Sequence, residues 1–239
     1  MKTLLVLLGG LKLGKVLLTG GTMLVSVFAY TLVFGWIYAL GLVAMIFVHE
    51  MGHFVAARRR GLAVGAPTFI PFVGAWIEMK DQPHDAEVEA YVGLAGPLAG
   101  TLAAVGCYFL ARSESSDALL AIAYAGLFIN LFNLIPLAPF DGGRITAVLS
   151  PRLWLSGVPI LVALFFYRPS PLLALMAIIA APQVVKAWRF DPAAPENARY
   201  YAASAETRLT YAVFYVGLAA YLAIMAHDVH EMLAGVRAR

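Results

Sequence analysis

Long uncharged apolar runs alternate with short polar breaks along most of the chain, a pattern typical of a polytopic membrane protein. The run from 16 to 48 would form a helix about 50 Å long, well beyond a hydrocarbon core of about 30 Å. It therefore has to turn once, and Gly35 near its middle is the predicted break. The predicted spans are 16–34, 36–57, 86–111, 118–135, 153–167, 170–188 and 211–226.

Two stretches do not fit a regular span. Residues 61–85 combine prolines, glycines and alternating apolar positions, which predict a short β-hairpin or re-entrant loop near the membrane surface. An exposed strand around 69–77 could pair with an extended substrate segment; a plain amphipathic connector is the alternative interpretation. Farther on, Pro136 and Pro139 stop regular helix and leave Asp141 in an irregular segment.

The composition supports a membrane protein and narrows its chemistry. Hydrophobic residues make up 62% of the chain and charged residues 13%, which excludes an ordinary soluble protein. The net charge of +3 comes from basic residues scattered between apolar runs, so a nucleic-acid partner is not expected. Cys107 is the only cysteine, which excludes an internal disulfide and a cysteine-based zinc site. Residues 1–10 are expected to form an interfacial helix rather than a cleaved signal peptide.

Together these patterns predict an all-α polytopic membrane protein with about six to seven transmembrane helices and a short β-hairpin or re-entrant loop after the second. The whole chain, 1–239, is expected to form a single integral-membrane domain.

The candidate chemistry begins at the end of the second predicted span, where His49, Glu50 and His53 form the pattern H-E-x-x-H. Residues four apart lie on one face of a helix, so the two histidines can each give one imidazole nitrogen to a single zinc ion. Glu50 flanks that face and can take a proton from water without being a ligand. The alternative is a helix end whose histidines merely lie at the headgroup level.

Asp141 is the candidate third ligand, because a catalytic zinc ion often has a carboxylate among its three protein ligands. The alternative is an aspartate that caps a helix beginning near Gly142. Gly96 and Gly100, four residues apart, predict a face for close helix packing. His84 and the cluster of His227, Asp228 and His230 are interpreted as solvated polar residues.

The segments HEMGH at 49–53, GPLAG at 96–100 and NLIPLAPFDGG at 133–143 occur in this order. With them the chain resembles the site-2 protease family of intramembrane zinc metalloproteases, over roughly residues 16–150. The resemblance implies one zinc ion per chain, held by His49, His53 and Asp141, with Glu50 as the general base. It also places the family's asparagine on Asn133, which could donate to the developing oxyanion. Phe140 stands where the family usually has leucine.

Many members of this family carry a PDZ domain or a nucleotide-sensing regulatory domain, and this chain has room for neither. The expected organisation is therefore a catalytic core at 16–150 with additional C-terminal spans at 151–239. The implied function is hydrolysis of a peptide bond within or near the membrane-spanning segment of a membrane-embedded protein or peptide. A metal-ion transporter and a catalytically silent chaperone of the same fold are the rival hypotheses, although no inverted repeat favours a transporter.

The distribution of lysine and arginine predicts the orientation of a multi-pass protein of the cell membrane. With seven spans and the N-terminus inside, thirteen of the 17 basic residues fall on the inner side. The outer side receives Arg112, Arg168, Arg237 and Arg239. This bias predicts a metal site that opens toward the cytoplasm.

Overall fold

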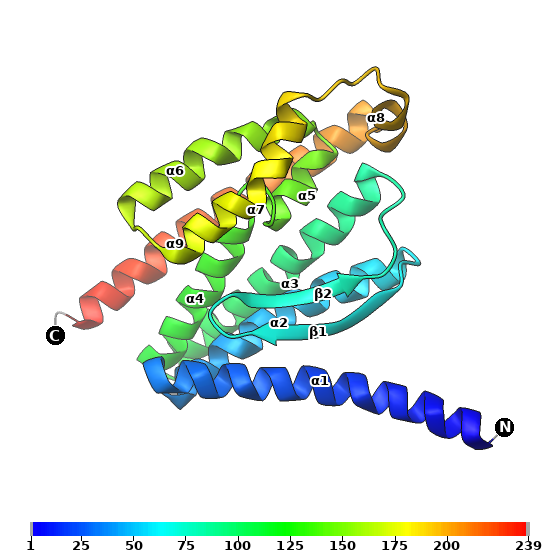
Figure 1. Ribbon diagram of the computed structural model, residues 1–239. Coiled ribbons are helices and arrows are strands. Elements are labelled where there is room, and N and C mark those ends of the chain that lie inside the picture. The colour runs from blue at the N-terminus through cyan, green and yellow to red at the C-terminus, as the bar shows by residue number, and fades with distance from the viewer. Residues whose placement is uncertain (1, 238–239) are drawn as a thin grey trace.

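The computed structural model describes the backbone of residues 2–237, and their side chains except those of 2–13, 15–16, 78–79 and 237. Helices form most of the structure, together with one two-stranded sheet (Figure 1). The elements in order are α1 (Lys2–Phe34), α2 (Trp36–Arg59), β1 (Val64–Ile70), β2 (Gly74–Met79), α3 (Ala86–Ser113), α4 (Asp117–Asn133), α5 (Asp141–Ala147), the 3-10 helix η1 (Pro151–Ser156), α6 (Gly157–Tyr167), α7 (Pro171–Trp188), α8 (Pro195–Tyr200) and α9 (Ala205–Arg237).

The described residues contain five helices that are long and apolar enough to cross a membrane: α1, α2, α3, α7 and α9. Two further apolar helices, α4 and the continuous segment Pro151–Tyr167, are shorter. The 17 residues of α4 extend about 25 Å, somewhat less than a hydrocarbon core. The chain is therefore a multi-pass membrane protein, and the predicted all-α fold with a hairpin after the second helix is confirmed.

The predicted turn at Gly35 is confirmed, because α1 ends at Phe34 and α2 begins at Trp36. Gly35 has φ 84°, in the left-handed region that favours glycine. Its N–H donates to the Thr31 carbonyl and its own carbonyl accepts from the Ala39 N–H, each at 3.0 Å. The backbone on both sides of the turn therefore stays hydrogen-bonded, as a chain in lipid requires.

The hairpin packs along α1 through its first strand. The Thr19 hydroxyl donates to the Pro67 carbonyl at 2.7 Å, and the Phe69 N–H donates to the Thr22 hydroxyl at 3.2 Å. These bonds occupy polar groups on the outer edge of β1, while Pro67 itself has no N–H to satisfy. Among the side chains that the structure describes, none from α1 bonds to the outer edge of β2.

The centre of the molecule is formed by α3, which packs against α2, α4 and α5. The last helix, α9, packs mainly against α4 and is longer than the predicted 211–226. The predicted connector before it contains α8, which is tied to α3 by a 2.7 Å bond from the Tyr200 hydroxyl to the Glu89 carboxylate. Burial, and then the neighbouring negative charge of Glu89, raise the pKa of Tyr200.

Candidate metal centre

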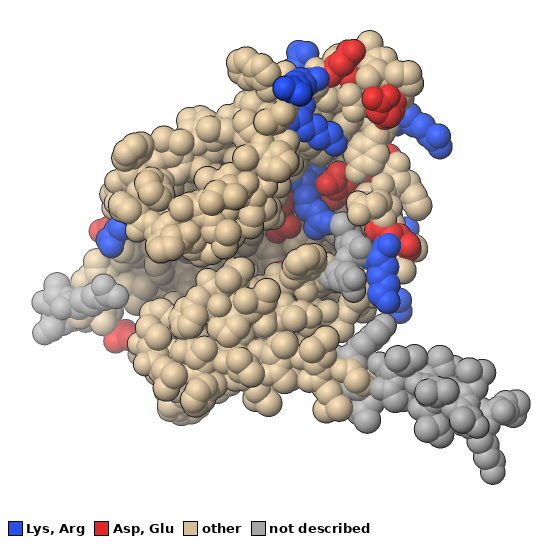
Figure 2. All heavy atoms as spheres, viewed as in Figure 1, with Lys and Arg blue, Asp and Glu red and all other residues tan. Residues whose placement is uncertain are grey.

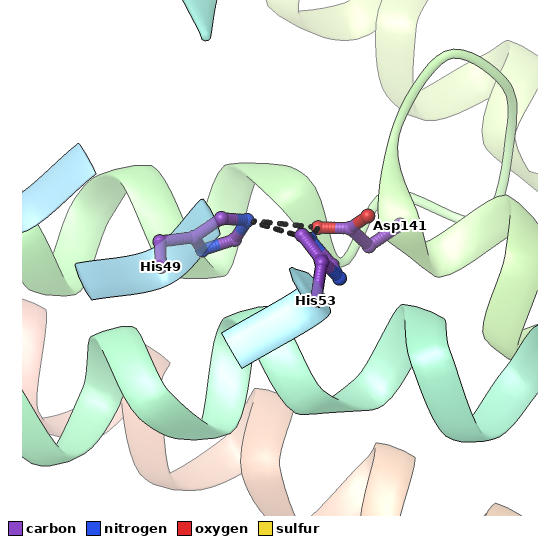
Figure 3. Close-up of side chains that lie close together, drawn as sticks. All are labelled: His49, His53 and Asp141. Atoms are coloured by element: carbon purple, nitrogen blue, oxygen red, sulfur yellow. Dashed lines mark hydrogen bonds and ion pairs between the residues drawn. The ribbon is translucent and has the colours of Figure 1, made fainter. Parts of the chain in front are cut away.

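Three side chains from two distant segments converge in the interior between α2, α3 and α5 (Figure 3). His49 and His53 project from α2, and Asp141 is the first residue of α5. Their exposed fractions are 4%, 7% and 7%, so water does not solvate them freely. Asp141 Oδ2 lies 3.0 Å from His49 Nε2 and 3.2 Å from His53 Nε2, and the two Nε2 atoms are 3.1 Å apart.

The second nitrogen of each imidazole is engaged by a different helix. The Nδ1–H of His53 donates to the Val92 carbonyl in α3 at 2.7 Å, and a carbonyl can only accept. The Nδ1–H of His49 donates to Asn130 Oδ1 in α4 at 2.8 Å, while the Asn130 amide nitrogen donates to the Gly126 carbonyl. In the neutral imidazoles both protons are therefore on Nδ1, and both Nε2 atoms present lone pairs.

Two nitrogen lone pairs and a carboxylate oxygen thus lie in mutual contact, with no proton from the neutral imidazoles between them. Such an arrangement is repulsive unless a metal ion lies between the three atoms or one imidazole takes up a proton. Their separations of 3.0 to 3.2 Å are close to the roughly 3.3 Å expected between ligands of a tetrahedral zinc ion with bonds of about 2.0–2.1 Å. The three residues form a cluster that fits one metal ion.

Glycines make this convergence sterically possible. A Cβ atom at Gly96 would lie 2.2 Å from His53 Nε2, and one at Gly52 would lie 2.3 Å from the Ala95 carbonyl oxygen. Gly52, inside the HEMGH segment, therefore lets α2 approach the backbone of α3, and Gly96 leaves room for the imidazole. Gly100 does the same for Asn130, whose Oδ1 lies 2.3 Å from the site of a Cβ. The predicted packing face of GPLAG is thus also a wall of the metal centre.

The local fold around Asp141 does not use its carboxylate as a helix cap. The N-cap residue of α5 is Phe140, with no side-chain cap bond, and Asp141 is turned toward the histidines (Figure 3). A Cβ at Gly142 would lie 2.2 Å from the Leu134 carbonyl oxygen. The glycine after Asp141 therefore allows the preceding segment to fold tightly against the start of α5.

The remaining predicted site residues lie near the cluster or on the helices that support it. Glu50 is partly buried on α2, and its carboxylate interacts electrostatically with the three clustered residues and with Arg144. Asn133 lies at the end of α4, where its amide nitrogen donates to the Ile129 carbonyl at 3.0 Å. His84 and the His227, Asp228 and His230 group do not join the metal cluster found among the described residues.

Asn130 is the site residue whose role the sequence did not assign. It is only 1% exposed and fixes the orientation of His49 from α4. An amide inside an uncharged apolar helix is costly unless it has a partner, and this was the available signal. The family resemblance had assigned the amide to Asn133, three residues farther along the same helix.

Residues 37–115 match the model of Peptidase family M50, the family of the site-2 proteases. The predicted family resemblance is confirmed. The M50 match covers most of α2, the whole hairpin and α3, and hence both histidines of the cluster.

Several curated proteins are similar to this chain over about half of its length. The zinc metalloprotease MJ0392 of Methanocaldococcus jannaschii is 32% identical over 116 residues, which are 45% of this chain and 32% of that protein. The putative zinc metalloprotease Rip3 of Mycobacterium tuberculosis is 30% identical over 133 residues, covering 50% and 33%. The probable chloroplastic zinc metalloprotease EGY1 of Arabidopsis thaliana is 24% identical over 153 residues, covering 44% and 28%.

The match thus spans about a third of the length of these relatives. Among solved structures, the site-2 protease from Methanocaldococcus jannaschii aligns with a TM-score of 0.46 and 21% identity, covering 71% of this chain and 87% of that one.

Replacing Gly96 by alanine should displace the His53 imidazole, because the new methyl group would overlap its Nε2 atom. We expect the affinity for zinc to fall at least about tenfold, the range seen when groups that orient metal ligands are lost. The dissociation constant, measured by chelator competition on purified protein, checks this. Gly106→Ala is the matched control, because a Cβ at Gly106 on the same helix meets nothing within 4 Å. Equal affinities for the two variants would contradict the role given to Gly96.

Proposed function

We propose that this protein is an intramembrane zinc metalloprotease that hydrolyses a peptide bond within or near the membrane-spanning segment of a membrane protein. The observation that carries the proposal is the contact of three buried lone-pair atoms, from His49, His53 and Asp141, between membrane helices. The M50 match and the relatives named as zinc metalloproteases support the same chemistry.

Zinc is the metal that this donor set favours. Two imidazole nitrogens and one carboxylate oxygen are a known ligand set of catalytic zinc, and three protein ligands leave the fourth position open. A zinc ion held there supplies a Lewis acid that activates water and polarises a carbonyl group. The imidazoles remain neutral and correctly turned because Val92 and Asn130 hold their Nδ1–H groups.

Glu50 is the proposed general base and acid of the reaction. Its carboxylate accepts a proton from the attacking water, whose oxygen bonds to the carbonyl carbon, and delivers it to the amine nitrogen as the C–N bond breaks. Asn133 provides a donor for the carbonyl oxygen as negative charge develops on it. An amide nitrogen carries two N–H groups, so the bond to Ile129 leaves one for this purpose.

The open edge of β2 provides a docking place for an unwound substrate. Pro67 and Phe69 direct polar backbone groups toward α1, so they form non-hydrogen-bonded pairs with their partners Ile77 and Ala75. The N–H and C=O groups of Ala75 and Ile77 therefore point away from β1, toward the open edge. Figure 2 shows a groove between the hairpin and α7, where an extended peptide can add to β2 as a third strand.

The metal site is proposed to open toward the cytoplasm. The basic ends of α2 and α8 lie at one end of the molecule, where lysine and arginine gather in Figure 2. Arg112 lies in the last turn of α3, and Arg168 directly follows α6. Cytoplasmic loops of membrane proteins usually carry more lysine and arginine than outer loops. The end that contains the C-terminal residues of α2 and α8 is therefore proposed to face the cytoplasm.

Measuring the zinc bound per chain together with the rate of peptide hydrolysis separates the roles of the site residues. Glu50→Gln should keep stoichiometric zinc and lose hydrolysis of a membrane-spanning model peptide by at least about a hundredfold, because an amide cannot take the proton. Asp141→Ala should lose zinc and activity together, and Asn133→Ala should slow turnover with zinc retained. Substantial turnover by Glu50→Gln would exclude the mechanism. Zinc without any cleavage by the unmodified protein would favour a chaperone or a transporter.

Strand addition predicts a specific effect of removing one backbone N–H. Ala75→Pro should raise the KM for a membrane-spanning peptide several-fold with zinc still bound, because the lost N–H faces the open edge and not β1. Ala75→Val adds side-chain bulk but keeps the N–H, and should bind substrate nearly normally. Equal KM values for Ala75→Pro and the unmodified protein would exclude pairing at this position.

The proposed orientation predicts which loops an impermeant thiol reagent reaches in intact cells. Starting from Cys107→Ala, a cysteine introduced at Ser115 should be labelled from outside, and one at Ser204 only after permeabilisation. Both serines are exposed, Ser115 in the turn between α3 and α4 and Ser204 in the loop just before α9. The reverse pattern would place the metal site on the outer face.

A further inference from the structure

The segment 134–140 joins α4 to α5 and ends at the candidate ligand Asp141. Most of it is buried, with Leu134, Leu137 and Phe140 at 3%, 1% and 4% exposure, so its backbone polar groups need partners within the protein. Its two prolines have no N–H. Leu134, Ile135, Leu137 and Phe140 donate to backbone carbonyls of the segment itself or of the end of α4. The remaining donor, the Ala138 N–H, binds a side chain from outside the segment, Gln183 Oε1 in α7.

Two carbonyls on either side of Asp141 are also bound by C-terminal side chains. The Tyr215 hydroxyl in α9 donates to the Leu134 carbonyl at 2.6 Å. The Trp154 Nε1–H in η1 donates to the Gly143 carbonyl at 2.7 Å. Three elements beyond residue 150 thus each contribute one hydrogen bond to the few residues that carry the third ligand.

We propose that Gln183, Trp154 and Tyr215 are positioning residues that hold the carboxylate of Asp141 against His49 and His53. The proposal rests on the metal site of the proposed function. The seven residues of α5 are too few to form a stable helix alone, so its orientation comes from tertiary contacts. The three side chains fix the chain before and after Asp141, and thereby the direction in which its side chain leaves the backbone.

Gln183 also links the metal centre to the wall of the groove. Among the described elements, α7 packs chiefly against η1 and α6 and lies across the groove from the hairpin (Figures 1 and 2). Its one hydrogen bond to the 134–140 segment therefore ties the placement of Asp141 to the placement of α7. The helices after residue 150 are parts of the metal centre and not only additional membrane anchors.

The first test measures the dissociation constant for zinc, by chelator competition, in the purified full chain. Gln183→Leu removes the acceptor of the Ala138 N–H and should weaken binding about tenfold, as expected for loss of a group that supports a metal ligand. Gln183→Glu keeps an acceptor oxygen and should restore most of the affinity. Tyr215→Phe should weaken binding several-fold. Tyr221→Phe is its matched control, because Tyr221 is on the same helix and 43% exposed.

The second test uses metal-free protein, so that it does not depend on the proposed function. Hydrogen exchange of a peptide covering 134–140 should be faster in Gln183→Leu than in the unmodified protein or Gln183→Glu. Unchanged zinc affinity and unchanged exchange in both Gln183→Leu and Tyr215→Phe would overturn the proposal. If the unmodified protein binds no zinc, the metalloprotease assignment fails. The exchange of 134–140 still tests the role of Gln183 in that case: faster exchange in Gln183→Leu supports it, and unchanged exchange contradicts it. If Gln183→Leu fails to fold, the zinc affinity and hydrogen exchange of Tyr215→Phe, compared with those of Tyr221→Phe, test the proposal instead.

Discussion

The fold depends on keeping three electron-rich atoms in contact inside an apolar protein. Two imidazole nitrogens and one carboxylate oxygen, all within 3.2 Å of one another, repel each other unless a metal ion or an added proton lies between them. Without either, the surrounding structure has to oppose the repulsion through bonds to other atoms of the same residues. The bonds that the two imidazoles donate to Val92 in α3 and Asn130 in α4 do this, and they set the tautomers that leave both Nε2 lone pairs available to a metal ion.

Those bonds exist only because the backbones of the helices come unusually close. Gly52 and Gly96 lie where α2 meets α3, and a methyl group at either would overlap an atom of the opposite helix. Small residues usually indicate nothing more than helix packing in membranes. Here the close packing and the metal centre are the same structure, because the backbone carbonyl that orients His53 is reached only across this contact.

The sequence predicted what is local and regular. The break at Gly35 followed from helix length against membrane thickness, and the shared face of His49 and His53 followed from the helical period. Asp141, 88 residues after His53, was linked to them only through resemblance and ligand chemistry, since no period in the sequence brings it there. Asn130 and Asn133 are nearly one helical turn apart in α4. Only the packing of α4 against α2 shows that Asn130, and not Asn133, binds His49. No sequence pattern predicts the hydrogen bonds that the C-terminal helices make to 134–140.

The open edge of β2 and an unwound substrate segment both have backbone polar groups that need hydrogen-bond partners. A peptide bond in a membrane helix has its carbonyl already hydrogen-bonded, and freeing it exposes backbone groups that each cost several kcal/mol in lipid. Ala75 and Ile77 have backbone N–H and C=O groups that point away from β1 and can pair with an added strand. Under the proposed strand addition, pairing the two would satisfy both sets of groups and would offset the cost of unwinding the substrate. Because that edge runs along the groove beside α7, whose Gln183 binds the segment before Asp141, the proposed substrate pairing and the proposed metal geometry would meet in one region.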